Sequence, residues 1–327
     1  MNVGANLLEV KGLYKSFPVA KKGFFGSRRM TILRDVNLSL REGEILGLVG
    51  ESGSGKSTIG RAILSLSPAD AGSITFDGVE LKGASSSTLK RLRKDMQIVF
   101  QDPYASLDPR KSVRATLNEA LDTHKLHLGK RREARLRELL ELVGLNPEFL
   151  DRHPHQFSGG QRQRIGIARA LAVEPRFIVA DEAVSALDVS IQAQILNLIA
   201  DLRAKTGISM LFISHDLSVV RFISDRVVVL YLGKIMETGP ADDVHFSPAH
   251  PYTAALVSAE PSLHHEAKRV VLKGEVPSPL SPPSGCVFRT RCPFSLPACA
   301  TEVPTLREFS NGRWKACIRD DILELQR

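Results

Sequence analysis

The sequence predicts an α/β fold built around a central sheet, and three observations support this. Up to about residue 250, short apolar runs that suit buried strands alternate with amphipathic stretches of helical periodicity. A glycine-rich turn directly joins the first buried run to a helical stretch. Of the 327 residues, 43% are hydrophobic and 24% are charged, which excludes disordered and collagen-like classes.

The apolar runs predict strands and the periodic stretches predict helices. The strands are expected at 45–49, 98–100, 177–180, 210–213 and 227–232. Helices are expected at 56–66, 113–150, 158–171 and 191–202. A hairpin that turns at Gly233 follows the last strand. Seven of the 18 prolines lie between Pro277 and Pro304, so an irregular C-terminal appendage is expected there.

Composition also limits the location and the partners. No apolar run reaches eighteen residues, and no basic segment followed by an apolar one opens the chain, so neither a membrane span nor a secretory leader is expected. The net charge of +8 favours anionic partners such as nucleotides. The basic clusters are short and scattered, so nucleic acid is not expected as a partner.

The glycine-rich turn carries a phosphate-binding pattern. Residues 50–57, GESGSGKS, match G-x-x-x-x-G-K-S/T between a strand and a helix. The loop N–H groups and the positive helix end would surround phosphate oxygens, Lys56 would reach the β- and γ-phosphates of ATP, and Ser57 would bind Mg²⁺. The alternative is a turn that binds nothing. The expected nucleotide contacts are Gly50, Ser52, Gly53, Ser54, Gly55, Lys56, Ser57 and Thr58.

Two carboxylates follow the strand at 177–180. Asp181 can hold Mg²⁺ through water, and Glu182 can polarise the attacking water or take its proton. A solvated turn is the alternative for such a pair, and the phosphate loop in the same chain makes it the weaker one.

A second helix start can bind an anion. Ser158 followed by Gln161 forms a capping box, and Gly159 and Gly160 lie between them. The helix N-terminus therefore predicts a second phosphate site, on a second anion or on one shared between subunits.

These motifs, in this order, resemble the ATP-binding subunits of ABC transporters. Phe157–Gln161 is similar to the LSGGQ signature, with Phe at its first position. Gln101 in VFQDPYASLDPR resembles the Q-loop glutamine, which binds Mg²⁺ and lies against the membrane subunits. Ser185–Asp188 resembles the D-loop, and His215 resembles the switch histidine that senses the γ-phosphate. Phe17 matches the aromatic residue that stacks on adenine, and Tyr14 is close enough to compete.

The resemblance implies a P-loop NTPase fold of the ABC type. Residues 1–250 would form the nucleotide-binding domain, with a central sheet, an antiparallel β subdomain and a helical subdomain at about 102–165, and 251–327 would form a small irregular extension. Two subunits would close around two ATP molecules, so that Ser158 and Gly160 of one contact the γ-phosphate on Lys56 of the other. Ala183 replaces the usual Pro after the catalytic Glu, which removes no catalytic group, and an active ATPase is expected.

The C-terminal region is similar to that of oligopeptide and dipeptide permease ATPases, through residues 247–253 (SPAHPYT) and 285–299. The segment QDPYASLDPR looks like the second ATPase of such systems. The implied partners are two transmembrane permease subunits, a sister ATPase in a heterodimer (a homodimer stays open) and, indirectly, a periplasmic or extracellular substrate-binding protein. The implied place is the cytoplasmic face of the bacterial inner membrane, as a peripheral subunit.

The implied cargo is a di- or oligopeptide, with nickel, glutathione or short glycans as alternatives. A soluble ABC ATPase acting on DNA or ribosomes is the other class. Its DNA-repair members carry a long coiled coil, whereas only about 100 residues separate Lys56 from Ser158, without sustained heptads. The soluble ABC ATPases that act on ribosomes carry two cassettes in one chain, whereas this sequence contains a single set of cassette motifs.

All four cysteines, Cys286, Cys292, Cys299 and Cys317, lie in the extension. Their separations of five, six and seventeen residues are not those of a zinc ribbon, and an expected cytosolic location argues against disulfides. Four thiolates suit a tetrahedral metal site or an iron–sulfur cluster, with Arg289 and Arg291 expected to help keep them ionised. The resemblance implies a [4Fe–4S] cluster with a stabilising role. Zinc and free structural thiols remain alternatives.

Overall fold

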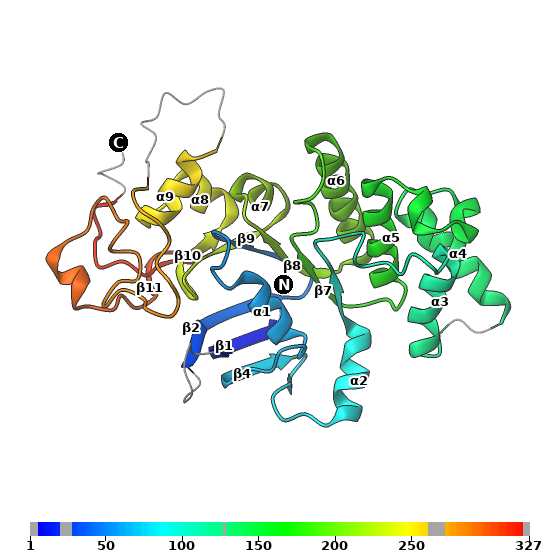
Figure 1. The fold of residues 1–327 in the computed structure, drawn as a ribbon, viewed down its shortest axis with the longest axis horizontal. Coiled ribbons are helices and arrows are strands. Elements are labelled where there is room, and N and C mark those ends of the chain that lie inside the picture. Colours follow the sequence, from blue (N-terminus) through cyan, green and yellow to red (C-terminus); the bar gives the residue numbers. More distant parts are fainter. Residues whose placement is uncertain (1–5, 20–27, 127–128, 261–271, 323–327) are drawn as a thin grey trace. The chain divides into compact units, whose positions relative to one another are not determined.

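The computed structural model describes residues 6–19, 28–126, 129–260 and 272–322 (Figure 1). These residues fall into two compact units. The first unit contains 41–44 and 83–213, and the second contains 6–40, 45–82 and the chain from 214 onward. Residues 1–5, on which the expectation of no secretory leader depends, lie outside the described residues.

Three parallel strands form the sheet of the first unit, in the order β6 (Met96–Val99), β7 (Phe177–Asp181) and β8 (Ser209–Ser214). Ile98 pairs with Val179, which in turn lies opposite Leu211. Every residue of β7 and β8 is buried, as expected for apolar runs in a parallel sheet covered on both faces. The three predicted strands of this unit are confirmed, and Asp181 stands at the carboxyl end of the middle one.

The helices of the first unit account for most of its remaining residues. They are α2 (Ser86–Asp95), α3 (Val113–Thr123), α4 (Lys130–Leu142), α5 (Gly159–Leu171) and α6 (Val189–Thr206), with 3₁₀ turns at Pro147–Asp151 and Pro154–Gln156. The continuous helix expected over 113–150 is wrong, because the chain leaves the helix after Thr123 and again after Leu142. The apolar face of α4 is nevertheless buried as predicted, at Leu136, Leu139 and Leu140.

The second unit contains two sheets. One has the order β11 (Arg307–Ser310), β12 (Arg313–Lys315), β10 (Lys234–Pro240), β9 (Arg226–Tyr231) and β3 (Ile45–Val49). Strands β3 and β9 are parallel, whereas β10 and β12 are antiparallel to their neighbours. The predicted hairpin is confirmed: Gly233, with φ 76°, closes the turn between β9 and β10.

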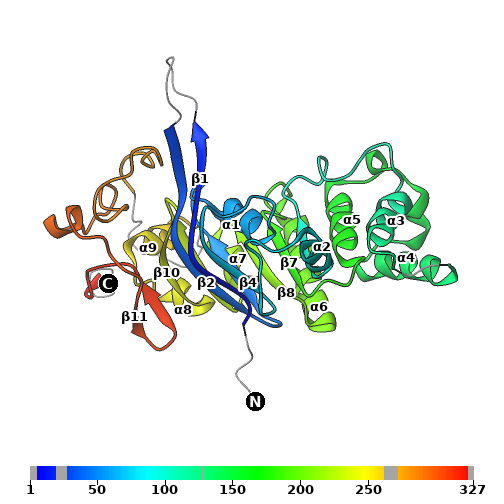
Figure 2. The same ribbon diagram turned by 90° about the horizontal axis from the view of Figure 1, so that it is seen from below.

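The other sheet is antiparallel and has the order β2 (Arg28–Arg41), β1 (Asn6–Val19), β4 (Ala71–Phe76) and β5 (Val79–Glu80). Figure 2 shows β1 and β2 as long strands that run side by side. Each has 14 residues, and neither was predicted from its own residue pattern. The resemblance alone implied an antiparallel β subdomain.

Helices α1 (Lys56–Ile63), α7 (Leu217–Ile223), α8 (Ala241–Phe246) and α9 (Pro251–Ser258) belong to the second unit. Helix α1 is shorter than predicted, because it ends at Ile63 and leaves Leu66 54% exposed. Within the described part of the chain, no helix has the length and apolar character needed to cross a membrane.

The C-terminal region is less irregular than expected. Besides a 3₁₀ turn at Pro297–Ala300, it contributes β11 and β12, and β12 pairs with β10 through Glu237 and Lys315. The Glu237 side chain is completely buried and accepts the N–H groups of Ala249 and His250, both at 2.9 Å. The extension is therefore joined to the sheet through strand pairing and a buried polar contact.

Candidate active site

The phosphate-loop residues lie between β3 and α1 in the second unit. Gly55 precedes the helix with φ 108°, and a Cβ at this position would lie 2.7 Å from the Leu33 side chain, so only glycine fits without displacement. Helix α1 has no acidic residue in its first turn and no side-chain cap. Its first N–H groups and its positive end therefore face the loop, which suits an anion.

The Lys56 side chain is 4% exposed and folds back over the loop. Its Nζ donates to the carbonyl oxygens of Gly50, at 2.7 Å, and of Glu51, at 3.1 Å. Ser54 Oγ is buried in the same loop and has no hydrogen-bond partner among the described residues. Ser52 and Gly53 are exposed, and Ser57 and Thr58 are half-buried in the first turn of α1. The loop thus presents a cation and an unused hydroxyl close to the helix start.

The carboxylates of the first unit lie where β7 ends. Asp181 is buried, and the next residue, Glu182, has a left-handed backbone with φ 50°, which costs a non-glycine residue about 1–2 kcal/mol. Its N–H donates to the carbonyl of Ile213 at 3.0 Å. Strained backbone at a carboxylate that follows a buried strand is typical of a functional position.

Gln101 and Glu182 are brought together, although they lie 81 positions apart in the sequence. Gln101 Nε2 donates to Glu182 Oε2 at 2.9 Å and lies 3.4 Å from Ser185 Oγ. Ser185 Oγ in turn donates to the Glu182 carbonyl at 3.0 Å. Three residues that were predicted separately, from the Q-loop, the strand end and the D-loop, therefore form one hydrogen-bonded cluster.

The start of α5 has the predicted capping box. Gln161 N donates to Ser158 Oγ at 3.3 Å, and Ser158 N donates to Gln161 Oε1 at 3.0 Å. A Cβ on Gly160 would lie 2.5 Å from the Ile191 side chain on α6, so this glycine permits close helix packing. Ser158 is exposed, and so is Asp188, the residue that precedes α6.

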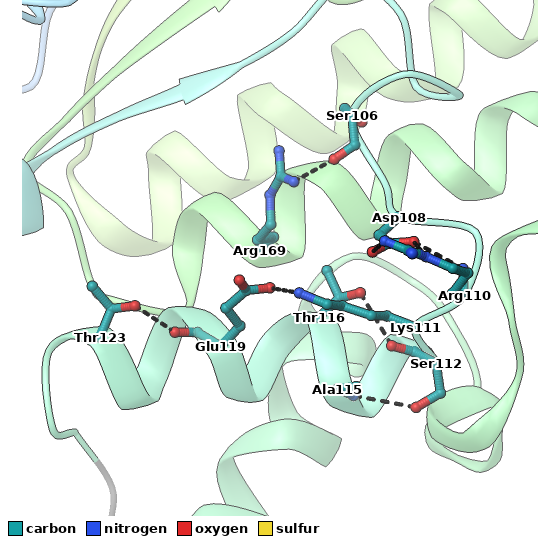
Figure 3. A network of polar contacts seen from close by, with 10 residues as sticks. All are labelled: Ser106, Asp108, Arg110, Lys111, Ser112, Ala115, Thr116, Glu119, Thr123 and Arg169. Carbon is teal, nitrogen blue, oxygen red and sulfur yellow. Dashed lines mark hydrogen bonds and ion pairs between the residues drawn. The ribbon is translucent and has the colours of Figure 1, made fainter.

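A polar network holds the segment that follows Gln101 (Figure 3). Arg169 on α5 donates to the Ser106 carbonyl, and burial lowers the pKa of this arginine. Lys111 pairs with Glu119 on α3 at 2.6 Å. In the stretch between Ser106 and Lys111, the Arg110 guanidinium lowers the pKa of Asp108 to about 2. The segment is therefore attached to both α5 and α3 within the first unit.

The remaining nucleotide candidates belong to the second unit. His215 directly follows β8 and is exposed. Phe17 and Tyr14 lie on β1 with 36% and 41% of their surfaces exposed, and Lys15 Nζ lies 5.2 Å from the Phe17 ring centre. Both aromatic side chains remain candidates for stacking on a base.

The four cysteines line one small cavity of the second unit. Phe288, His250 and Phe294 contribute to its wall. The expectation that arginines keep the thiols ionised is wrong. Burial raises the pKa of Cys286 and Cys317, and it raises that of Cys292 to about 12. Among the described residues, no group of three or more His, Cys, Asp or Glu side chains is arranged to hold a metal ion.

Arg291 is not among the residues that line that cavity, and it contacts the phosphate loop instead. Its two terminal nitrogens lie 2.6 and 3.0 Å from the carboxylate oxygens of Glu51. The Tyr252 hydroxyl accepts the N–H of Glu51 at 2.9 Å. The sequence contained no signal for these contacts, which join residues 240 and 201 positions apart.

Comparison with known proteins agrees with this arrangement. Residues 33–185 match the family model described as ABC transporter, and 236–299 match that of the oligopeptide/dipeptide transporter C-terminal region. The chain is 54% identical over 318 residues to a Brucella ovis protein named as a peptide import ATP-binding protein, covering 97% of this chain and 98% of that one. It is 48% identical to the Bacillus subtilis oligopeptide transport ATP-binding protein AppF, covering 95% and 96%.

Solved structures are also similar. One is an ATP-binding cassette described as dimeric, in a post-hydrolysis state with ADP and phosphate. Its TM-score is 0.63 at 29% identity, and the match covers 72% of this chain and 98% of that one. Another is cbiO1 of Clostridium perfringens, described as part of an ABC transporter complex, with TM-score 0.63, 25% identity and coverage of 73% and 90%.

Proposed function

Because the chain belongs to the ATP-binding subunits of ABC transporters, in the group with the oligopeptide/dipeptide C-terminal region, we propose that its ATPase activity energises an importer of di- or oligopeptides. ATP hydrolysis with Mg²⁺ is the activity of the family. The match over 236–299, together with the names of its full-length relatives, supports peptide import. In this proposal, residues 1–250 form the ATPase domain and 251–327 form the extension.

The proposed chemistry uses the residues of the candidate site in distinct roles. Lys56 and the N–H groups of residues 50–58 bind the triphosphate, and Ser57, Gln101 and Asp181 serve the Mg²⁺ ion. Glu182 is the base that takes a proton from the attacking water. Gln101 Nε2 donates to Glu182 Oε2 at 2.9 Å, which supports a Q-loop glutamine whose position depends on the protonation of Glu182.

The remaining roles concern the γ-phosphate and the subunit interface. His215 senses the γ-phosphate, and Phe17 or Tyr14 stacks on adenine. In the closed dimer, Ser158, Gly159, Gly160 and Gln161 of one subunit contact the nucleotide of the other, with Asp188 close to the same interface. One γ-phosphate would then bind both subunits, and its hydrolysis would remove the contact that favours closure.

The proposed partners are two transmembrane permease subunits, a sister ATPase in a heterodimer and, indirectly, a substrate-binding protein, with this chain peripheral on the cytoplasmic face of the membrane.

The test is affinity purification of a tagged Glu182→Gln variant with ATP from gently solubilised membranes, followed by mass spectrometry. Recovery of permeases and a sister ATPase would support import. A peptide titration of the binding protein encoded beside them would separate peptides from nickel, glutathione or short glycans. Recovery of ribosomal or DNA-repair proteins without a permease would contradict the proposal.

The four cysteines are the residues proposed to hold a metal group, although the described side chains are not arranged around a metal ion. Four cysteine sulfurs lining one cavity are the donor set that a [4Fe–4S] cluster requires. Cys286, Cys292, Cys299 and Cys317 would hold the cluster, which would stabilise a proline-rich segment with little core of its own. Anaerobic purification followed by iron, sulfide and zinc analysis tests this. Zinc without iron would replace the cluster with a zinc site, and the absence of both would leave structural thiols.

A further inference from the structure

Glu51 occupies a position of the phosphate loop that the G-x-x-x-x-G-K-S/T pattern leaves open. Its side chain makes a two-point ion pair with Arg291, at 2.6 and 3.0 Å, and its backbone N–H donates to Tyr252 at 2.9 Å. Its carbonyl accepts from Lys56 at 3.1 Å. One loop residue thus joins the phosphate-binding lysine to two residues of the C-terminal part of the chain.

Arg291 is held firmly in place. Its side chain is 7% exposed, and its N–H donates to the Phe288 carbonyl at 3.0 Å, which closes a turn between Cys286 and Cys292. The Phe288 ring packs against Tyr231, at 5.2 Å, and Tyr252, at 5.3 Å between ring centres. The Tyr231 hydroxyl lies 3.4 Å from Arg291 Nη1. A rigid aromatic cluster therefore fixes the guanidinium opposite Glu51.

We propose that Arg291 is a positioning residue of the nucleotide site, which fixes the phosphate loop through Glu51 and neutralises this carboxylate beside the bound triphosphate. The proposal rests on the proposed function, since it requires residues 50–58 to bind nucleotide. According to this proposal, the cysteine-containing segment contributes to nucleotide binding through Arg291. The pair is partly buried and bidentate, the geometry in which an arginine–carboxylate contact is strongest.

The sign of the effect follows from charge. Without Arg291, Glu51 keeps its negative charge in a loop that must receive a polyanion, and one anchor of the loop is lost. Nucleotide affinity should therefore fall. If Glu51 is also made neutral, the repulsion disappears and much of the affinity should return. General damage to the fold would not be reversed in this way.

The experiment measures the Kd of a fluorescent ATP analogue with Mg²⁺ for the full-length protein. Arg291→Ala should raise the Kd roughly ten-fold, within the range of coupling between neighbouring sites. Glu51→Gln with Arg291→Ala should recover most of that loss. Arg291→Lys keeps the positive charge but loses the two-point geometry, so its Kd should lie between those of wild type and Arg291→Ala. If Arg291→Ala does not fold, Arg291→Lys takes its place in the comparison. Arg221→Ala, which removes a surface pair with Asp242 at 2.8 Å in the same unit, is the matched control and should bind like wild type.

Thermal unfolding without nucleotide verifies that each variant is folded. An Arg291→Ala Kd within two-fold of wild type would overturn the inference, and so would a double variant as weak as Arg291→Ala alone. A wild-type protein that binds no analogue would overturn the proposed function and this inference together. Normal wild-type binding with an unaffected Arg291→Ala variant would overturn the inference alone.

Discussion

The guanidinium carbon of Arg162 lies 3.8 Å from the ring centre of Tyr104. Arg162 is in the first turns of α5, which begins at the signature sequence, and Tyr104 follows Gln101 by three residues. Arg162 is buried and also donates from Nε to the Pro154 carbonyl at 2.6 Å, whereas Tyr104 is 65% exposed. The exposed ring thus covers a buried charge and joins the Q-loop segment to the signature helix.

Tyr104→Ala should lower the free energy of unfolding by about 1 kcal/mol, because it removes the cation–π contact and uncovers the guanidinium. Tyr104→Phe keeps the ring and should unfold like wild type. Urea unfolding of the three proteins measures the difference. Equal stability of the alanine and phenylalanine variants would show that the contact contributes nothing.

Glu182→Gln should retain ATP binding but hydrolyse at least about a hundred-fold more slowly, because the amide cannot accept the proton of the attacking water. Lys56→Ala should lose binding, since Lys56 supplies the cation of the phosphate loop. Steady-state phosphate release and nucleotide titration separate the two effects. Hydrolysis by Glu182→Gln at the wild-type rate would remove Glu182 from the role of base.

Gly233→Ala should destabilise the protein by more than about 2 kcal/mol, because it combines a left-handed backbone with a clash. A Cβ at Gly233 would lie 1.8 Å from the Ile32 carbonyl oxygen, and the Gly233 N–H donates to the Ser54 carbonyl at 2.9 Å. The Kd of the fluorescent ATP analogue should therefore also rise, because Gly233 contacts the phosphate loop at Ser54. Gly78, with φ 74° and open space around it, is the matched control, and its alanine variant should cost only about 1 kcal/mol. Equal losses in thermal unfolding would contradict the argument.

Glu260 should make the stability depend on pH. Burial raises the pKa of its carboxyl from 4.5 to about 7, opposed by Ser218 and Arg221 and assisted by Asp216, and His245 Nδ1 lies 3.8 Å from it. Between pH 4.5 and 7 the folded state keeps the proton and the unfolded state releases it. Stability should therefore fall as the pH rises through this window, by about 2–3 kcal/mol in total.

Glu260→Gln, which is neutral at every pH, tests this dependence. Denaturant unfolding at pH 5 and pH 8 should show a smaller decrease for the variant than for wild type, and a more stable variant at pH 8. Parallel decreases in the two proteins would assign the pH dependence to other groups.

Local sequence patterns were sufficient for the elements that surround the nucleotide motifs. Strands β3, β7, β8 and β9 are short apolar runs, and burial within a parallel sheet requires such runs regardless of their neighbours. The capping box at Ser158 and the turn at Gly233 are equally local, since each depends on residues a few positions apart. The breaks after Thr123 and Leu142 were missed, although Gly129, Gly144 and Pro147 are the kinds of residue that interrupt helices.

The order of the motifs, the strand–loop–helix around Lys56 and the chemical types of the site residues can all be read from neighbouring residues. Three contacts appear only once the chain is folded: Gln101 donates to Glu182, β12 extends the sheet through β10, and Arg291 pairs with Glu51 rather than with the cysteines. The reason is physical: helices, turns and strands follow from neighbours within a few residues, whereas these contacts depend on how packing brings distant segments of the chain together.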